Sequence, residues 1–242
     1  MTSAAETTRA DVADLARRHE RSFRRSGRLI GTLGVPFLDF QTGPTPAAAF
    51  DALDGPCLIA SNHRSVFDAL AGMYAIGKYG YSARTLSASW LWEDKRLGRL
   101  LDSVGAIPLP PGRGAIDAID QAVEVLRGGG RVLMTPEGRV VPPEDRPGGV
   151  GDGHKILSKI ALAADVPVVP VALVGTDEFW PMGASRPVLR PRERPVIGYG
   201  YGMPVDCRSS NHRENVRTVM GAIAGVVHEI EATMLRPAAA PV

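Results

Sequence analysis

The sequence predicts an α/β fold, with a mostly parallel sheet that carries helices on both faces. Short apolar strand-like runs alternate along the chain with amphipathic helical segments, which is typical of such folds. The 242 residues are 44% hydrophobic and 22% charged, an ordinary composition for a globular protein. A chain of this length suits one large domain.

Each expected element has a local signal. Short apolar runs predict strands at residues 57–60, 85–88, 106–109, 132–134 and 168–174. Helical periodicity predicts helices at residues 68–79, 90–101, 114–127, 155–164 and 211–235. Residues 188–189 and 196–199 look like an antiparallel pair of strands. In an α/β fold of this kind the chemistry gathers where strands end and helices begin.

Residues 1–40 are predicted to form an amphipathic element outside the main domain, which spans residues 41–242. Residues 1–28 hold seven arginines and four acidic residues, a net charge of +3, and the predicted helix at 9–30 has one apolar face. An apolar run follows at 29–38, and the turn-rich linker at 41–46 separates it from the domain. A basic amphipathic helix suits the headgroup region of an anionic bilayer. The alternative is a solvated helix that caps the domain.

Several classes of protein are disfavoured. No run of eighteen uncharged residues and no secretory signal is present, so we expect a cytoplasmic protein held peripherally at the inner face of the cell membrane. Cys57 and Cys207 lie far apart and suggest neither a disulfide framework nor a zinc site. The N-terminal arginines are not interleaved with aromatic residues, which argues against nucleic acid as a partner.

A histidine and an aspartate follow the first main-domain strand. His63 stands just past its end, and Asp68 comes five residues later, one turn into the next helix. A carboxylate there can fold back to hydrogen-bond the imidazole, fix its tautomer and stabilise the imidazolium formed when the ring takes a proton. A structural histidine paired with a helix-end aspartate would show the same spacing.

Three further motifs follow in order. A tight turn after a strand reads Pro136-Glu137-Gly138, and its carboxylate and backbone amides suit either acceptor hydroxyls or an ordinary surface turn. A Gly-x-Ile-Pro sequence in residues 104–113 leads into a glycine-proline loop, and prolines interrupt the strand-like run at 165–171. Each of these motifs is unremarkable alone.

The order and spacing of the four motifs resemble those of the glycerolipid acyltransferase family, of the 1-acylglycerol-3-phosphate acyltransferase (PlsC-like) type. The motifs are Asn-His-x4-Asp, Gly-x-Ile-Pro, Pro-Glu-Gly and Val-Pro-Val-Val-Pro-Val, and the resemblance covers roughly residues 55–205. It implies a largely parallel sheet wrapped by helices, a membrane-facing N-terminal element and an O-acyltransferase activity.

The resemblance also implies roles for single residues. His63 is the general base for an acceptor hydroxyl, and Asp68 orients and charges it. The hydroxyl oxygen attacks the thioester of acyl-CoA or acyl-carrier protein directly, so no acyl-enzyme, metal or bound cofactor is needed. The acceptor is a lysophospholipid or another lipid-like alcohol. The residues implied in substrate binding are Asn62, Arg64, Arg113, Glu137, Gly138 and Arg139.

Two positions depart from the family pattern. Members that make phosphatidic acid commonly end the second motif in an arginine that pairs with the acceptor phosphate, and Pro111 stands at that place. The usual Glu-Gly-Thr-Arg of the third motif is Glu-Gly-Arg-Val at residues 137–140. Arg113 and Arg139 stand nearby as substitutes. We therefore hypothesise a non-phosphorylated acceptor, such as a glycolipid or a specialised metabolite, beside the lysophospholipid.

Two other functions stay open. A hydrolase would use the same base on water, although the chain has no Gly-x-Ser-x-Gly motif. A catalytically impaired, membrane-associated homologue would act as a scaffold. The intact pair of His63 and Asp68 favours the acyltransferase. The polar, glycine-rich segment at 144–153 is expected to be either a lid over the site or an ordinary surface loop.

Overall fold

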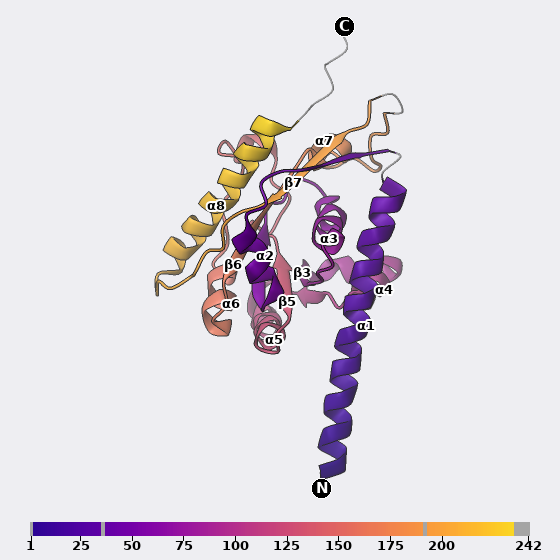
Figure 1. Ribbon diagram of the computed structural model, residues 1–242, viewed down its shortest axis with the longest axis vertical. Coiled ribbons are helices and arrows are strands. Elements are labelled where there is room, and N and C mark those ends of the chain that lie inside the picture. Colours follow the sequence, from indigo (N-terminus) through magenta and orange to yellow (C-terminus); the bar gives the residue numbers. More distant parts are fainter. Residues whose placement is uncertain (1, 35–36, 191–192, 235–242) are drawn as a thin grey trace, which may run out of the picture.

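A seven-stranded sheet forms the centre of the computed structural model, which describes residues 2–34, 37–190 and 193–234 (Figure 1). The strands are β1 (Asp39–Thr42), β2 (Cys57–Ser61), β3 (Arg84–Ala88), β4 (Ile107–Leu109), β5 (Arg131–Met134), β6 (Val168–Val174) and β7 (Val196–Tyr201). Their order across the sheet is β1-β7-β6-β2-β5-β3-β4. Five strands run parallel, and β7 pairs antiparallel with β6 and parallel with β1. The predicted mostly parallel α/β sheet is confirmed.

Helices cover both faces of this sheet (Figure 1). The α-helices are α1 (Thr2–Gly34), α2 (Ala47–Asp54), α3 (Asp68–Lys78), α4 (Lys95–Ser103), α5 (Ala115–Arg127), α6 (Ile156–Ala164), α7 (Thr176–Phe179) and α8 (His212–Thr233). Short 3-10 helices are η1 (Ser89–Glu93), η2 (Gly112–Gly114) and η3 (Pro143–Asp145). One core packs α5, α6 and α8 against the sheet, and the other packs α1, α2 and α3.

Strand β2 contributes to both cores and leads into the predicted site. Its five residues are all buried, with Leu58 and Ala60 in one core and Cys57 and Ile59 in the other. This alternation follows from the two-residue period of a strand. Burial also raises the pKa of the Cys57 thiol to about 12, which disfavours the nucleophilic thiolate at neutral pH. The strand is therefore a rigid support for the residues that follow it.

Helix α1 packs on α3 through its C-terminal half. Phe23 is 1% exposed, and Gly27 lies so close to α3 that a Cβ placed there would stand 2.6 Å from the carbonyl oxygen of Met73. The apolar face predicted for this helix is therefore partly covered by the protein's own domain. In the part of the chain that the structure describes, no helix is long and apolar enough to cross a membrane.

The structure differs from the sequence prediction at four places. Strand β1 includes residues 41–42 of the region read as a linker at 41–46, and helix α2, which was not predicted, begins directly after it at Ala47. The helix expected at 90–101 divides into η1 and α4. Residues 188–189 lie in a loop and form no strand, because β7 takes β6 and β1 as its partners. Helix α1 begins earlier than the predicted residue 9, and two residues of the apolar run at 29–38 lie outside the described chain.

Candidate active site

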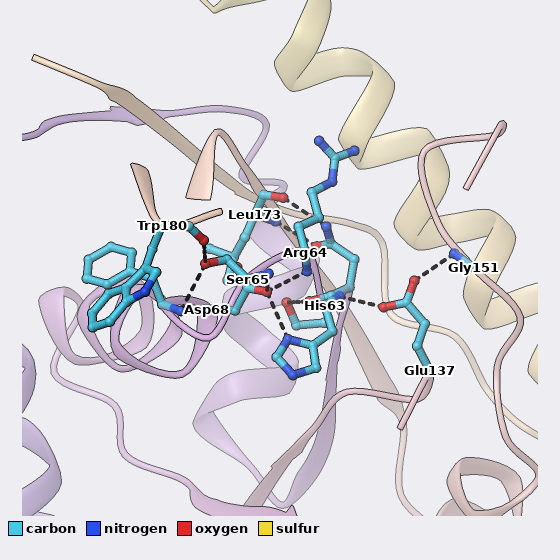
Figure 2. Close-up of polar contacts among 11 residues, drawn as sticks. His63, Arg64, Ser65, Asp68, Glu137, Gly151, Leu173 and Trp180 are labelled. Carbon is cyan, nitrogen blue, oxygen red and sulfur yellow. Dashed lines mark hydrogen bonds and ion pairs between the residues drawn. The ribbon is translucent and has the colours of Figure 1, made fainter. Parts of the chain in front are cut away.

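The two residues predicted to act together are in contact (Figure 2). His63 follows the carboxyl end of β2, and Asp68 is the first residue of α3. The imidazole Nδ1 lies 2.9 Å from Asp68 Oδ2. The imidazole side chain is 22% exposed and the carboxylate side chain 2% exposed. A buried carboxylate thus holds a ring that a substrate can reach.

The Asp68 carboxylate also organises the loop that carries the histidine. Its Oδ2 atom accepts hydrogen bonds from the backbone N–H groups of Arg64, at 2.5 Å, and Ser65, at 2.7 Å. Hydrogen bonds to an ionised acceptor are the strong ones, and a buried carboxylate requires such compensation. Asp68 therefore fixes both the imidazole ring of His63 and the backbone of the two residues that follow His63.

The contact sets the roles of the two ring nitrogens. A carboxylate accepts hydrogen bonds, so Nδ1 of His63 carries the proton that it donates to Asp68. The lone pair of the neutral ring is then on Nε2. A ring held this way can accept a proton at Nε2, and the adjacent carboxylate stabilises the imidazolium that results.

Asn62 ties the start of the same loop to β6. Its side-chain amide donates to the carbonyl oxygen of Leu173 at 2.8 Å and accepts from the N–H of Leu173 at 2.8 Å. Asn62 is 1% exposed. Both polar ends of the side chain are occupied by protein backbone, so the structure places this predicted substrate-binding residue in a supporting position.

Glu137 lies in the turn after β5, beside the histidine. Its carboxylate accepts hydrogen bonds from the backbone N–H groups of His63 and Gly151 (Figure 2). Burial raises the pKa of Glu137, and the two N–H donors oppose that rise. Gly138 follows with φ of +68°, in the left-handed region where glycine is free of strain, and its N–H donates to the carbonyl of Thr135.

The predicted arginines are dispersed. The Arg64 guanidinium points away from the imidazole (Figure 2). It bonds Glu231 of α8 at 3.1 Å and the Gly149 carbonyl at 3.0 Å. Arg139 is exposed and pairs with Asp145 at 2.6 Å. The side chain of Arg113 lies outside the described part of the molecule. The structure thus brings His63, Asp68 and Glu137 together, and it turns Arg64 toward α8.

Sequence reasoning missed the long-range contacts that hold the site. In the segment at 146–153, the Gly151 N–H bonds Glu137, the Gly149 carbonyl accepts from Arg64, and Arg146 pairs with Asp177 of α7. The Val141 N–H donates to the His63 carbonyl at 2.8 Å. Sequence spacing gives no signal for these partners. The segment predicted at 144–153 is held at several points, which favours an ordinary surface loop over a mobile lid.

Within the described residues, no three histidine, cysteine, aspartate or glutamate side chains gather where they could hold a metal ion. His63 and Asp68 supply an imidazole and carboxylate pair that can take up a proton. Such a pair at the carboxyl ends of parallel strands is the arrangement expected of a general-base site in an α/β protein.

Comparison with known proteins identifies the family. The sequence model of the acyltransferase family matches residues 41–174, which is more than half of the chain. The chain belongs to the acyltransferase family, as the four motifs predicted. The matched residues include both His63 and Asp68.

Two named relatives come from plants. The chloroplastic 1-acyl-sn-glycerol-3-phosphate acyltransferase BAT2 of Brassica napus is 27% identical over 175 residues, which cover 71% of this chain and 48% of that protein. The chloroplastic 1-acyl-sn-glycerol-3-phosphate acyltransferase LPAT1 of Arabidopsis thaliana is 28% identical over 134 residues, which cover 54% of this chain and 35% of that protein. The chain thus spans about half or less of these relatives.

A solved structure shares the fold. The crystal structure of the 1-acyl-sn-glycerophosphate (LPA) acyltransferase PlsC from Thermotoga maritima superposes with a TM-score of 0.66. The match covers 98% of this chain and 86% of that one, at 19% identity. The likeness therefore confirms the arrangement of sheet and helices.

Proposed function

We propose that this protein is an O-acyltransferase that moves a fatty acyl group from acyl-CoA or acyl-carrier protein to the hydroxyl of a lysophospholipid or another lipid-like alcohol. The observation that carries the proposal is the 2.9 Å contact between a reachable imidazole, His63, and a buried carboxylate, Asp68. Membership of the acyltransferase family supports it, as do the plant relatives, which are named 1-acyl-sn-glycerol-3-phosphate acyltransferases.

The proposed reaction is a single direct transfer. The acceptor hydroxyl gives its proton to Nε2 of His63 while its oxygen attacks the thioester carbonyl carbon. Asp68 stabilises the imidazolium through Nδ1. The tetrahedral intermediate then expels the thiolate, the carbon–sulfur bond breaks, and the imidazolium returns the proton to sulfur. The products are an ester and a free thiol, with no bound cofactor taking part.

The acceptor class follows from the charges near the site. The arginine that remains next to the third motif, Arg139, already pairs with Asp145, and Pro111 replaces the arginine of the second motif. A lost bidentate contact between arginine and phosphate weakens binding by a few kcal/mol. These observations favour a non-phosphorylated alcohol as the second candidate acceptor, beside lysophosphatidic acid.

A panel of acceptors tests both the reaction and its acceptor. Purified protein is incubated with a labelled acyl-CoA, and with lysophosphatidic acid, a monoacylglycerol or a glycolipid, and the ester is measured by mass spectrometry. We expect ester formation to require an alcohol, with kcat/KM for a neutral alcohol at least equal to that for lysophosphatidic acid. A strong preference for the phosphorylated acceptor would overturn the neutral-acceptor hypothesis. Release of free fatty acid alone would indicate a hydrolase.

We also propose that α1 contacts an anionic membrane and holds the protein peripherally at the inner face of the cell membrane. Arg21, Arg25 and Arg28 lie on the face of α1 away from the Phe23 side that packs on α3, and they form no ion pair within the described chain. Beyond them Leu33 is 62% exposed. Each arginine near an anionic surface contributes about 1 kcal/mol.

Vesicle sedimentation tests this contact. Changing Arg21, Arg25 and Arg28 to serine should weaken binding to anionic vesicles by roughly 100-fold, because about 3 kcal/mol of attraction is lost. Neutral vesicles should bind the wild type poorly. The matched control removes the same charge from α8 and the loop before it, at Arg208, Arg213 and Arg217. Equal loss in both triple variants would contradict a specific role for α1.

A further inference from the structure

Both oxygens of the Glu137 carboxylate are occupied by backbone amides of two other segments. Oε2 accepts from the N–H of His63, and Oε1 accepts from the N–H of Gly151 at 2.6 Å. The close-up in Figure 2 shows the carboxylate between these two groups. Hydrogen bonds to an ionised carboxylate are shorter and stronger than neutral ones. The side chain is therefore committed to contacts within the protein.

The segment after β5 that carries Glu137 also bonds the carbonyl group of His63. The carbonyl oxygen of His63 accepts from the N–H of Val141 at 2.8 Å, so residues 137–141 bond both the donor and the acceptor of one peptide residue. The imidazole is held independently, by Asp68 of α3. Backbone and ring of the base are thus fixed by two different elements, one that follows β5 and one that begins α3.

The second partner of Glu137 belongs to a segment that is itself fixed. Gly149 accepts from Arg64, the neighbour of His63, and Arg146 pairs with Asp177. A Cβ added at Gly151 would lie 3.0 Å from the methyl carbons of Val141 and 3.4 Å from Glu137 Oε1. There is little free space on that side of the carboxylate. Glu137 therefore joins the loop of the base to the segment at 146–153.

We infer that Glu137 is a positioning residue for the base, and that its carboxylate braces the His63 backbone against the segment at 146–153 without contacting the acceptor. The inference rests on the proposed function, and it replaces the acceptor-binding role that the family resemblance implies for this residue. A brace of this kind acts on every acceptor alike. Displacement of a catalytic group by about 1 Å lowers the rate of the chemical step by up to roughly 100-fold.

The test separates positioning from acceptor binding by measuring kcat and KM with two acceptors, lysophosphatidic acid and a monoacylglycerol. Glu137→Gln keeps the size of the side chain but offers only one accepting oxygen for two N–H donors. We expect kcat to fall by about 10- to 100-fold with both acceptors, while KM for each stays within about twofold of the wild type. Glu144→Gln, at an exposed glutamate in the same region, should change neither constant.

A rise in KM for one acceptor with kcat unchanged would overturn the inference, because it would place the carboxylate on that acceptor. Hydrogen exchange supplies a readout that needs no activity, and its first part needs only the wild type. In the wild type, the amide hydrogens of His63 and Gly151 should exchange slowly, and Glu137→Gln should speed exchange at these two sites. Fast exchange at both in the wild type would contradict the brace.

The two proposals fail in distinguishable ways. If the wild type transferred acyl groups to no alcohol while both amides stayed protected by Glu137, the proposed function would fail and the contact would stand. If transfer proceeded and Glu137→Gln raised only the KM for one acceptor, the acyltransferase would stand and the brace would fail.

Discussion

Replacement of His63 by alanine is expected to lower acyl transfer by about 10²–10⁴-fold, the range that general-base assistance provides. The imidazole ring is partly exposed, and within the described residues it hydrogen-bonds to Asp68. Removing the ring therefore deletes the proton acceptor for the attacking hydroxyl and costs little packing. The measurement is kcat/KM for ester formation, with thermal unfolding recorded on the same sample.

His154→Ala is the matched control for this variant. His154 is exposed and lies near the site in sequence, at the start of the region leading into α6, with its Nδ1 accepting weakly from the Ile156 N–H at 3.4 Å. It should keep wild-type turnover. If His63→Ala retained transfer while both variants unfolded like the wild type, the base would have to be another group.

Asp68→Asn is expected to lower transfer by a comparable factor, for a different reason. The asparagine oxygen can still accept from the backbone N–H groups of Arg64 and Ser65, which bond the same Oδ2 atom. The negative charge that stabilises the imidazolium is lost, because a neutral amide oxygen replaces the carboxylate oxygen that the ring nitrogen contacts. The equivalent change in the serine-protease triad lowers kcat by about 10⁴-fold. Steady-state kinetics measure the effect.

Asp68→Ala should add a loss of stability to the loss of turnover. It leaves two buried N–H donors without an acceptor, and each such group costs about 1–3 kcal/mol. Urea unfolding should therefore show that the free energy of unfolding falls by about 2–6 kcal/mol in Asp68→Ala and by much less in Asp68→Asn. Wild-type turnover in Asp68→Asn would show that the aspartate only supports the loop.

The central strands and the helices beside them could be predicted from sequence. Strands β2, β5 and β6 are buried apolar runs, and their predicted bounds agree with the structure to within one residue at each end. A buried strand requires an uninterrupted apolar surface, which is visible in a short window of sequence. Helix α5 shows its apolar positions with equal clarity.

The edge of the sheet could not be predicted in the same way. Strand β1 reads Asp-Phe-Gln-Thr, is only partly buried, and hydrogen-bonds to one neighbour, so it carries no apolar pattern. Its identity as a strand depends on β7, which lies more than 150 residues away in the sequence. The pairing of residues 188–189 with 196–199 was wrong for the same reason. A short sequence window favours a neighbouring segment as partner, whereas β7 pairs with the distant strands β1 and β6.

For the site, local spacing in the sequence predicted the contact between His63 and Asp68 but none of the long-range contacts. His63 and Asp68 are five residues apart, and the bend from strand to helix brings them together. The N–H of His63 bonds Glu137 across 74 residues, and Asn62 bonds Leu173 across 111. Side chains that bond distant backbone show no period or spacing in one sequence. Their supporting positions therefore required the folded chain.

Direct attack by an acceptor hydroxyl, with His63 as its base, is tested most sharply by a quenched single-turnover experiment. Enzyme in excess is mixed with labelled acyl-CoA, with and without the acceptor alcohol, and thiol release, ester and intact protein mass are followed together. We predict that thiol release requires the alcohol, that the ester appears at the same rate, and that no acylated protein accumulates. A burst of thiol release without alcohol, accompanied by a covalent acyl-protein, would contradict the mechanism.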